Sequence, residues 1–199
     1  LERNLRASEM LDQIYRIQTI TGERVSNVVI MGSGEPMDNY DNVIRFLRLI
    51  SHEKGLNISQ RNLTVSTCGI VPGILKFAKE GLQVTLALSL HAPNDEVRKT
   101  LMPVANSYRL EDILDACHTY FEATGRRLTF EYSLVKGVND NLKEAAALTK
   151  LIKDQHGHVN LIPVNPIKER DYVQSDRRAI EAFRNYLEDH GINATVRRE

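Results

Sequence analysis

The amino-acid sequence predicts an α/β fold in which parallel strands are covered by helices, in the form of a barrel or part of one. Short runs rich in β-branched residues and leucine alternate with longer segments of helical spacing, which is typical of strand–helix–strand units. The strand segments are apolar along nearly their whole length, as expected for parallel strands that are buried on both faces. Polar residues follow several of these segments, and this placement favours a barrel over an open doubly wound sheet.

Six short segments carry the strand signal, because each is rich in Val, Ile, Thr or Leu and has the length of a strand. They span residues 27–31, 63–67, 84–90, 128–135, 159–164 and 194–197. The longer segments between them suit the helical crossovers that parallel strands require.

Helical spacing of apolar residues marks the connecting segments. The opening residues 3–20 predict a helix with Ser8 as its candidate N-cap. Residues 139–141 (Asn-Asp-Asn) predict a helix start, and Gly191 predicts a helix end. Two apolar helix faces are expected, one from Val43, Phe46, Leu47 and Ile50, the other from Leu110, Ile113, Leu114, Cys117 and Phe121.

Composition narrows the function classes. The chain has 199 residues, enough for one domain with a sizeable core. Lys plus Arg and Asp plus Glu both number 26, so the chain has no basic excess of the kind that marks a nucleic-acid-binding surface. Cys68 and Cys117 are far apart, which excludes a disulfide framework and a cysteine-built metal site within these residues. No apolar run approaches the roughly 20 residues of a membrane span, and a cytoplasmic protein is expected.

Polar residues cluster where the predicted strands end. Residues 32–35 (Gly-Ser-Gly-Glu) follow the first strand, 66–69 (Ser-Thr-Cys-Gly) end the second, 89–91 (Ser-Leu-His) end the third, and Asn165 follows a later one. In α/β barrels the loops at the carboxyl ends of the strands build the active site. Each residue taken alone also has an ordinary structural explanation, such as a tight turn at the glycines or a hydroxyl bonded to nearby backbone.

Five stretches of the sequence together resemble the RlmN-type enzymes. They are VVIMGSGEPMDNYDNV, LTVSTCGIVPGI, LALSLHAPNDEVRKTLMPVA, FEYSLVKGVNDN and VNLIPVNP, in this order over nearly the whole chain. RlmN-type enzymes are radical S-adenosylmethionine (SAM) methyltransferases that act on adenine C2 in 23S ribosomal RNA and in transfer RNA. The resemblance implies a partial (β/α)6 TIM-like barrel of the radical SAM type. Cfr-type enzymes, which methylate adenine C8, are the nearest alternative, and Pro36 after Gly-Glu favours the RlmN type.

The resemblance also implies which residues bind SAM. Gly34 and Glu35 match the segment that contacts the SAM amino group. Glu35 is expected to face the barrel mouth with its carboxylate free to meet an ammonium and not tied into a structural ion pair. Ser66 matches a contact to the polar part of SAM. The other matching residues are Ser89, Leu90 and His91, toward the ribose and carboxylate, and Asn165, near the adenosine.

Two reactive parts of the family pattern have no counterpart in residues 1–199. The resemblance places a 4Fe–4S cluster on a CxxxCxxC motif just before a segment like LERNLRASEM, and a methyl-carrying cysteine beyond a strand like ATVRRE. Neither Cys68 nor Cys117 matches a functional cysteine of the family, so no residue here is assigned a catalytic or metal-binding role. The chain is expected to be a fragment of the radical SAM core domain, inactive alone, without the first strand, the cluster loop, the N-terminal accessory domain and the C-terminal tail.

Partners follow from the same resemblance. The full-length enzyme is expected to bind 23S rRNA and tRNA, to take electrons from a donor such as flavodoxin, and to need no membrane. The strand near residues 28–31 is expected to lack its upstream neighbour, and its free edge would then favour self-association of the fragment.

Two other function classes stay open at this point. A part-barrel lyase or aldolase acting on a phosphorylated metabolite would need a Schiff-base lysine or a phosphate-binding glycine loop. Lys136 is the only lysine near a strand end, and its KGVND context is typical of a solvated loop. A non-catalytic binding module would describe the fragment but not its parent protein.

Overall fold

A six-stranded parallel sheet organises the chain, of which the computed structural model describes residues 2–165 and 172–197. Neighbouring strands in the sheet follow one another in sequence, in the order β1-β2-β3-β4-β5-β6. Their bounds are β1 Val28–Ile30, β2 Leu63–Thr67, β3 Thr85–Ser89, β4 Leu128–Leu134, β5 Gly157–Pro163 and β6 Ala194–Val196. The six strands predicted from the sequence are therefore confirmed, with small shifts at the ends.

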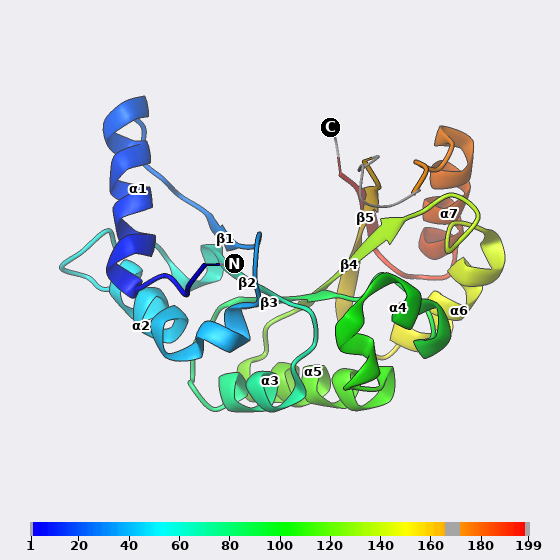
Figure 1. Ribbon diagram of the computed structural model, residues 1–199, viewed down its shortest axis with the longest axis horizontal. Helices are drawn as coiled ribbons and strands as arrows, with labels where there is room; N and C mark the ends of the chain where they lie inside the picture. Colours follow the sequence, from blue (N-terminus) through cyan, green and yellow to red (C-terminus); the bar gives the residue numbers. More distant parts are fainter. Residues whose placement is uncertain (1, 166–171, 198–199) are drawn as a thin grey trace.

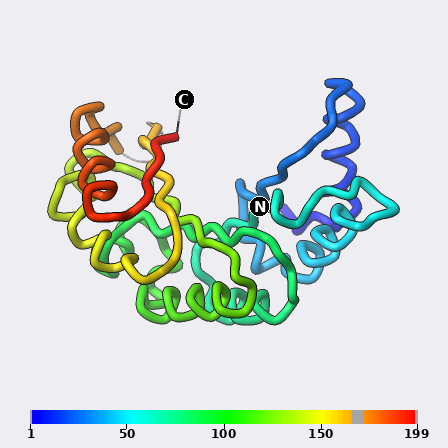
Figure 2. The backbone as a smooth tube through the Cα atoms, turned by 180° about the vertical axis from the view of Figure 1, so that it is seen from behind, coloured from blue at the N-terminus to red at the C-terminus, as the bar shows by residue number. Residues whose placement is uncertain are grey.

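Helices connect the strands and lie outside the curved sheet (Figure 1). The α-helices are α1 Ala7–Thr21, α2 Tyr40–Ile50, α3 Val71–Ala78, α4 Asp95–Leu101, α5 Leu110–Thr124, α6 Leu142–Ile152 and α7 Arg177–Asp189. Three short 3₁₀ turns, η1 Pro36–Asn39, η2 Gln60–Asn62 and η3 Pro103–Asn106, complete the described elements. Seen from behind, the chain forms an arch that is open on one side (Figure 2). This architecture is a part of a (β/α) barrel, as predicted.

The strand register decides which side chains face the helices and which face the inside of the arch. Residues in register on parallel strands point to the same face, and alternate residues point to opposite faces. Tyr132 of β4 packs against Phe183 of α7, with ring centroids 5.3 Å apart, so the face that carries Tyr132 is the helix side. The opposite, concave face carries a row of polar residues in register on β3, β4, β5 and β6: Ser89, Glu131, Asn160 and Thr195.

The helix faces follow the predicted apolar pattern. Val43, Phe46, Leu47 and Ile50 are all buried on α2. On α5 the same holds for four of the five predicted residues, Leu110, Ile113, Leu114 and Cys117. Phe121 departs from the prediction, since it is only partly buried and stacks on His156 with ring centroids 4.4 Å apart.

Strand β1 forms one edge of the sheet and pairs only with β2 among the described strands. The side chain of Val29 is 54% exposed and that of Met31, just past the strand, is 44% exposed, while Val28 and Ile30 are partly buried. A cavity of about 560 Å³ lies along this edge, between β1 and the start of α1. The expected self-association stays a prediction, and this edge is the surface on which it rests.

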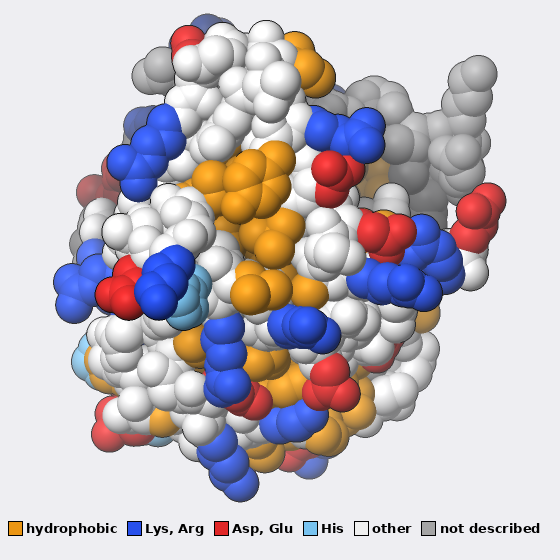
Figure 3. All heavy atoms as spheres, turned by 90° about the vertical axis from the view of Figure 1, so that its left-hand side faces the viewer, with side chains coloured by type: hydrophobic (Ala, Val, Ile, Leu, Met, Phe, Trp, Pro, Cys, Tyr) orange, Lys and Arg blue, Asp and Glu red, His pale blue; other side chains and the backbone are white. Residues whose placement is uncertain are grey.

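A second apolar surface lies on the side of the molecule formed by α1 and α2. Figure 3 shows a band of apolar side chains there, flanked by Lys, Arg, Asp and Glu. The large apolar side chains exposed on these helices are Tyr15, Ile17, Ile20 and Leu49. Across the two described ranges, no helix combines the length and the apolarity that crossing a membrane requires.

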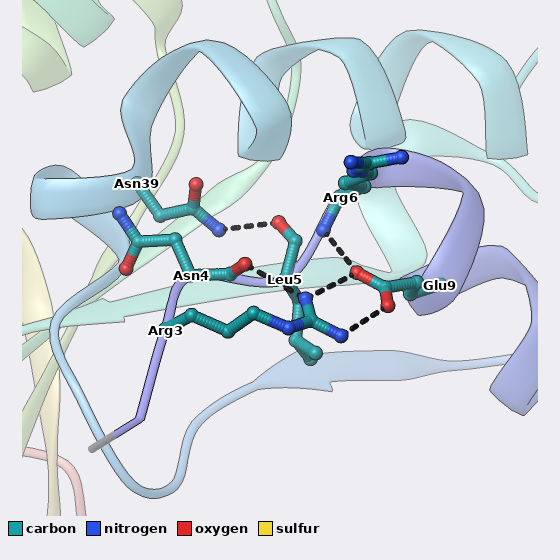
Figure 4. A network of polar contacts seen from close by, with 6 residues as sticks. All are labelled: Arg3, Asn4, Leu5, Arg6, Glu9 and Asn39. Atoms are coloured by element: carbon teal, nitrogen blue, oxygen red, sulfur yellow. Dashed lines mark hydrogen bonds and ion pairs between the residues drawn. The ribbon is translucent and has the colours of Figure 1, made fainter.

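Helix α1 begins at Ala7 with Arg6 as N-cap, so the prediction of Ser8 as N-cap is wrong. The physical reason is Glu9, whose carboxylate accepts a hydrogen bond from the Arg6 backbone N–H at 2.8 Å and also binds the Arg3 guanidinium (Figure 4). The other predicted caps are confirmed. The Asn141 side chain accepts from two backbone N–H groups at the start of α6, and Gly191 has a left-handed φ of 81° just past α7.

Gly157 opens β5 at a point without room for a side chain. A Cβ atom there would lie 2.5 Å from Cε2 of Phe130 and 3.0 Å from the carbonyl oxygen of Leu128. We predict that Gly157→Ala lowers the free energy of unfolding by about 1–3 kcal/mol, the usual cost of overpacking a core. Urea denaturation followed by circular dichroism measures the change.

Phe130→Leu provides the matched control, because it removes the ring atoms that the new methyl group would meet. The double variant should then lose less stability than the sum of the two single variants. Strictly additive losses would show that the Phe130 contact does not cause the effect.

Candidate functional site

The loop after β1 contains the first two predicted SAM-binding residues. Gly34 has a φ of 102°, a conformation that side-chain-bearing residues rarely adopt, so the turn depends on glycine here. Glu35 is the N-cap of η1, and its Oε1 accepts a hydrogen bond from the Met37 N–H at 3.0 Å. Both residues border the cavity beside β1.

The Glu35 carboxylate also joins this loop to the end of β2. Its Oε2 accepts a hydrogen bond from the Cys68 N–H at 2.7 Å. Each carboxylate oxygen therefore already accepts one backbone N–H, and the expectation that Glu35 is free to meet an ammonium stays a prediction. A carboxylate has about four acceptor positions, so two of them stay open for a ligand amine.

Ser66 and the residues after it end strand β2. Ser66 is buried and lies in register with Ala87 of β3, on the concave face. Thr67 has the ordinary role that its type suggests, since its Oγ1 accepts from the Gly69 N–H at 3.1 Å. Gly69 is required for packing as well as for its φ of 101°, because a Cβ atom would lie 2.9 Å from Ile113.

The segment after β3 is held by the backbone of β4. The N–H groups of Leu90 and His91 both donate to the carbonyl oxygen of Glu131, at 3.0 and 3.1 Å. His91 has a left-handed φ of 58°, which is strained for a residue with a side chain. Its imidazole Nδ1 accepts from the Ser133 N–H at 3.0 Å, so the ring proton sits on Nε2.

Burial is the main cause that lowers the pKa of His91, to about 4, and the nearby Arg98 charge lowers it further. The imidazole is therefore neutral near pH 7. Its Nδ1 is already committed to the Ser133 N–H. A neutral ring with this tautomer offers one N–H donor at Nε2 and no positive charge.

Asn139, which sequence reasoning assigned only to a helix start, belongs to the site's support. It is fully buried, and its Nδ2 donates to the carbonyl oxygens of His91 and Ser133 at 2.8 and 2.7 Å. Its Oδ1 accepts from the Val135 N–H at 2.8 Å. This one side chain therefore joins the ends of β3 and β4.

Arg98 of α4 is the other supporting residue that sequence reasoning missed. Its side chain is fully buried and donates to three carbonyl oxygens, those of Cys68 at 2.6 Å, Ser89 at 3.2 Å and Leu90 at 3.1 Å. No local pattern marked it, because arginine normally lies on an exposed helix face and its neighbours Glu96, Lys99 and Thr100 are polar or charged. Burial raises the pKa of the Cys68 thiol to about 12, with Glu35 adding to the effect, so Cys68 is not a reactive thiolate.

A buried carboxylate lies one layer inside the strand ends. Glu131 is 5% exposed and stands in register with Ser89 and Asn160 on the concave face. Its Oε2 accepts from Asn160 Nδ2 at 2.9 Å. Burial raises the pKa of this carboxyl, while the bond from Asn160 opposes the rise.

The strand ends after β1, β2, β3 and β4 are thus joined by one hydrogen-bond network. Five predicted residues belong to it or adjoin it, namely Gly34, Glu35, Ser89, Leu90 and His91. Ser66 faces the same concave side two residues before Cys68. Asn165 is exposed after β5, and no hydrogen bond within the described ranges connects it to this network.

The chain does not offer an iron–sulfur site among the described residues. Cys68 and Cys117 are both free, one half-buried after β2 and the other buried on α5. The described ranges hold no group of three or more His, Cys, Asp or Glu side chains placed to bind a metal. A cluster held by three thiolates does not fit these residues.

Comparison with known proteins gives one family and several relatives. The family model named Radical SAM superfamily matches residues 3–149. The chain is 66% identical over 197 residues to the "Probable dual-specificity RNA methyltransferase RlmN" of Lachnospira eligens, covering 99% of this chain and 56% of that protein. It is 57% identical to the protein of the same name from Clostridium perfringens (strain 13 / Type A), covering 99% and 57%.

Solved structures superpose on the chain as well. A radical SAM methyltransferase from Sphaerobacter thermophilus superposes with a TM-score of 0.94 at 43% identity, over 99% of this chain and 59% of that chain. Streptococcus suis SuiB bound to S-adenosylmethionine superposes with a TM-score of 0.70 at 18% identity, over 100% and 45%, a likeness of fold alone. The predicted resemblance to RlmN-type enzymes and the predicted partial barrel are confirmed.

His91 generates a prediction about pH. Its pKa is about 4 when folded against 6.5 in the unfolded chain, so the unfolded state binds more protons between these values. Its contribution to stability is therefore full above about pH 6.5 and is lost as the pH falls toward 4, with a loss on the order of 2 kcal/mol already at pH 5. Urea denaturation at pH 7.5, 6 and 5 measures the loss.

His91→Asn is the control, because asparagine tolerates the left-handed backbone and does not titrate. Its free energy of unfolding should fall less between pH 7.5 and 5 than that of the native protein, with other groups contributing equally to both. Equal losses in the two proteins would contradict a buried neutral His91.

Proposed function

We propose, from the premise that this chain belongs to the radical SAM superfamily, that it is the SAM-binding barrel core of an enzyme that methylates adenine C2 in 23S rRNA and tRNA. The observation that carries the proposal is the 56–66% identity to proteins named RlmN over at least 99% of the chain. The five motif stretches that resemble RlmN-type enzymes support it, since their polar residues lie at the strand ends described above.

The chain spans about half the length of the curated relatives it matches, 56% for the protein from Lachnospira eligens. We therefore propose that the remainder of the full-length protein supplies the cluster thiolates, the methyl-carrying cysteine and an RNA-binding accessory domain. Electron transfer from a donor such as flavodoxin and a cytoplasmic location belong to the same proposal. The described residues offer no group of side chains that would hold the cluster.

The residues at the carboxyl ends of β1 to β4, which we call the rim, suit the polar groups of SAM. The open acceptor positions of Glu35 and the carbonyl oxygen of Gly34 would receive the ammonium group, since oxygen acceptors and a negative charge match it. The Ser66 and Ser89 hydroxyls and the Nε2–H of His91 would bind the carboxylate and ribose oxygens. Asn165 would contact the adenosine. When bound, SAM supplies the methyl group and the radical chemistry of the superfamily.

A neutral His91 is useful in this arrangement. A donor without a positive charge can bind a ribose oxygen or a carboxylate without attracting other anions into the site. The sulfonium of SAM is itself a cation, and a charged imidazole beside it would be repelled. The burial that keeps the ring neutral therefore also favours SAM, and the bond from the Ser133 N–H leaves the ring proton on Nε2.

Two other activities fit less well. In a lyase or aldolase Lys136 would have to be a desolvated amine, but it is half exposed and forms an ion pair with Asp176 at 3.0 Å. Adenine C8 methylation of the Cfr type differs only in the carbon that is modified. Pro36 opens η1 directly after Glu35 and favours the RlmN type.

The test is the product formed by the full-length protein. After anaerobic cluster reconstitution, it is incubated with SAM, a reductant, a 23S rRNA fragment and tRNA, and the RNA nucleosides are separated by liquid chromatography and mass spectrometry. We expect 2-methyladenosine in both RNAs. 8-Methyladenosine would favour the Cfr-type alternative, and an unmodified RNA from cluster-loaded, SAM-binding protein would contradict the proposal.

Glu35→Gln in the full-length enzyme tests the binding role of the loop after β1. Glutamine keeps the shape but removes the charge, so SAM should bind more weakly by about 1.5–3 kcal/mol, the range for a hydrogen bond to a charged group. Isothermal titration calorimetry measures the affinity. Because the glutamine Nε2 cannot accept a hydrogen bond, the thermal midpoint must be recorded alongside.

Glu80→Gln is the matched control. Glu80 lies after α3 and binds Arg48 and Tyr40 rather than the rim. The Glu80→Gln variant loses the same charge as Glu35→Gln, and we expect it to bind SAM with native affinity. An unchanged affinity in Glu35→Gln would return Glu35 to a purely structural role.

A further inference from the structure

Arg98 is a buried cation without a carboxylate partner within the described ranges. Its positive charge is met instead by the carbonyl oxygens of Cys68, Ser89 and Leu90. Nη1 is buried as well and has no hydrogen-bond partner there. A buried guanidinium is costly to desolvate, and burial lowers the pKa of Arg98. Such a group persists only where its hydrogen bonds matter to the structure around it.

The three carbonyl groups belong to the strand ends that build the proposed SAM site. The carbonyl of Cys68 is bound by Arg98, while the N–H of the same residue is bound by Glu35. The carbonyls of Ser89 and Leu90 are bound by Arg98, and the next residue is His91. One guanidinium therefore connects the Glu35 loop to the Ser89–His91 segment.

The geometry of the guanidinium makes this connection rigid. Its N–H groups form a planar fork with fixed directions, unlike the single flexible ammonium of lysine. Nε and Nη2 donate from this plane to the carbonyls of Cys68, Ser89 and Leu90, which lie at the ends of β2 and β3. Helix α4 is itself anchored, because Asp95 Oδ1 accepts from the Leu110 N–H at the start of α5 at 2.9 Å.

We propose that Arg98 is a positioning residue for SAM binding: it does not touch SAM, and it sets the relative position of Glu35 and the Ser89–His91 segment through the carbonyls of Cys68, Ser89 and Leu90. This inference rests on the proposed function. Loss of the fork lets the two strand ends move independently, and a ligand that bridges them then binds more weakly.

The experiment uses the full-length, cluster-reconstituted enzyme and compares Arg98→Lys and Arg98→Met with Lys99→Met. Lys99 is the exposed neighbour on the same helix and is the matched control. SAM affinity is measured by calorimetry at a temperature about 10 °C or more below the thermal midpoint of each variant. RNA affinity is measured by filter binding. We expect SAM to bind about 10-fold more weakly to Arg98→Lys, the scale typical of a lost supporting partner, and more weakly still to Arg98→Met.

RNA affinity is the readout that separates positioning from general damage. In Arg98→Lys it should stay within about twofold of native, because a folded enzyme keeps its RNA-binding surface. A double-mutant cycle with Glu35→Gln adds a second criterion. The two losses in SAM affinity should be less than additive, because both act on the Cys68 backbone.

If both Arg98 variants fail to fold, Asp95→Ala is used in their place to loosen the attachment of α4. It removes one hydrogen bond that holds α4 on α5, and Glu96→Ala, exposed on the same turn, is its control. We expect Asp95→Ala to weaken SAM binding severalfold and Glu96→Ala to leave it unchanged.

The outcomes separate this inference from the proposed function. If the native enzyme does not bind SAM, the proposed function fails. If it binds SAM and methylates RNA while a folded Arg98→Lys, or Asp95→Ala in its place, binds SAM with native affinity, the positioning role fails alone. Equal losses of SAM and RNA affinity would likewise overturn it, since they would mark a general structural defect.

Discussion

Backbone groups that leave a parallel ladder at the strand ends need new partners, and three polar side chains provide them in this chain, two of them buried and the third, Glu35, partly buried. Glu35 accepts from the Cys68 N–H, Arg98 donates to the carbonyl of Cys68 and to two carbonyls after β3, and Asn139 serves both β3 and β4. A buried N–H or C=O without a partner is costly. The same bonds fix the loops that bear the proposed SAM-binding residues, so the stability of the rim and the geometry of the site have one origin.

The charges of these side chains match the groups that they satisfy. A carboxylate takes amide N–H groups, and a guanidinium takes carbonyl oxygens, which makes each bond a charge-assisted one. Burial and, to a smaller extent, the nearby Arg98 charge lower the pKa of His91, so the imidazole stays neutral and keeps its Nε2–H available. Five hydrogen bonds hold the strained backbone at His91. The N–H groups of Leu90 and His91 donate to the Glu131 carbonyl, and the other three bonds are donated by Ser133, Asn139 and Arg98 to His91 or Leu90. Strain of this kind persists only where the surroundings determine it.

The sequence was sufficient for the strands because their signal is local. Apolar β-branched runs and the residues that follow them can be read within a few positions. The register of the strands and the packing of Tyr132 on Phe183, which only the structure shows, then place Ser66 and Ser89 on the concave face. Hydrogen bonds between residues that lie far apart in the sequence cannot be predicted in this way. Glu35 and Cys68 are 33 positions apart, so nothing near Glu35 indicated that its carboxylate was already engaged. Arg98 was missed because arginine normally marks an exposed face, and the seven-residue helix that carries it has too few turns to show a clear period.

The network also divides the proposed site into two parts. It reaches from the loop after β1 to the end of β4, which covers the residues that would bind the amine, carboxylate and ribose of SAM. Asn165 comes after β5, where the last backbone bond before it is from the Val164 N–H to the Leu134 carbonyl at 3.2 Å. Its position depends on the β4–β5 pairing and not on Arg98 or Glu35 within the described ranges. Changes in the network should therefore act on the methionine part and the ribose of the ligand, while the part of the adenosine near Asn165 is governed separately by the strand that precedes this residue.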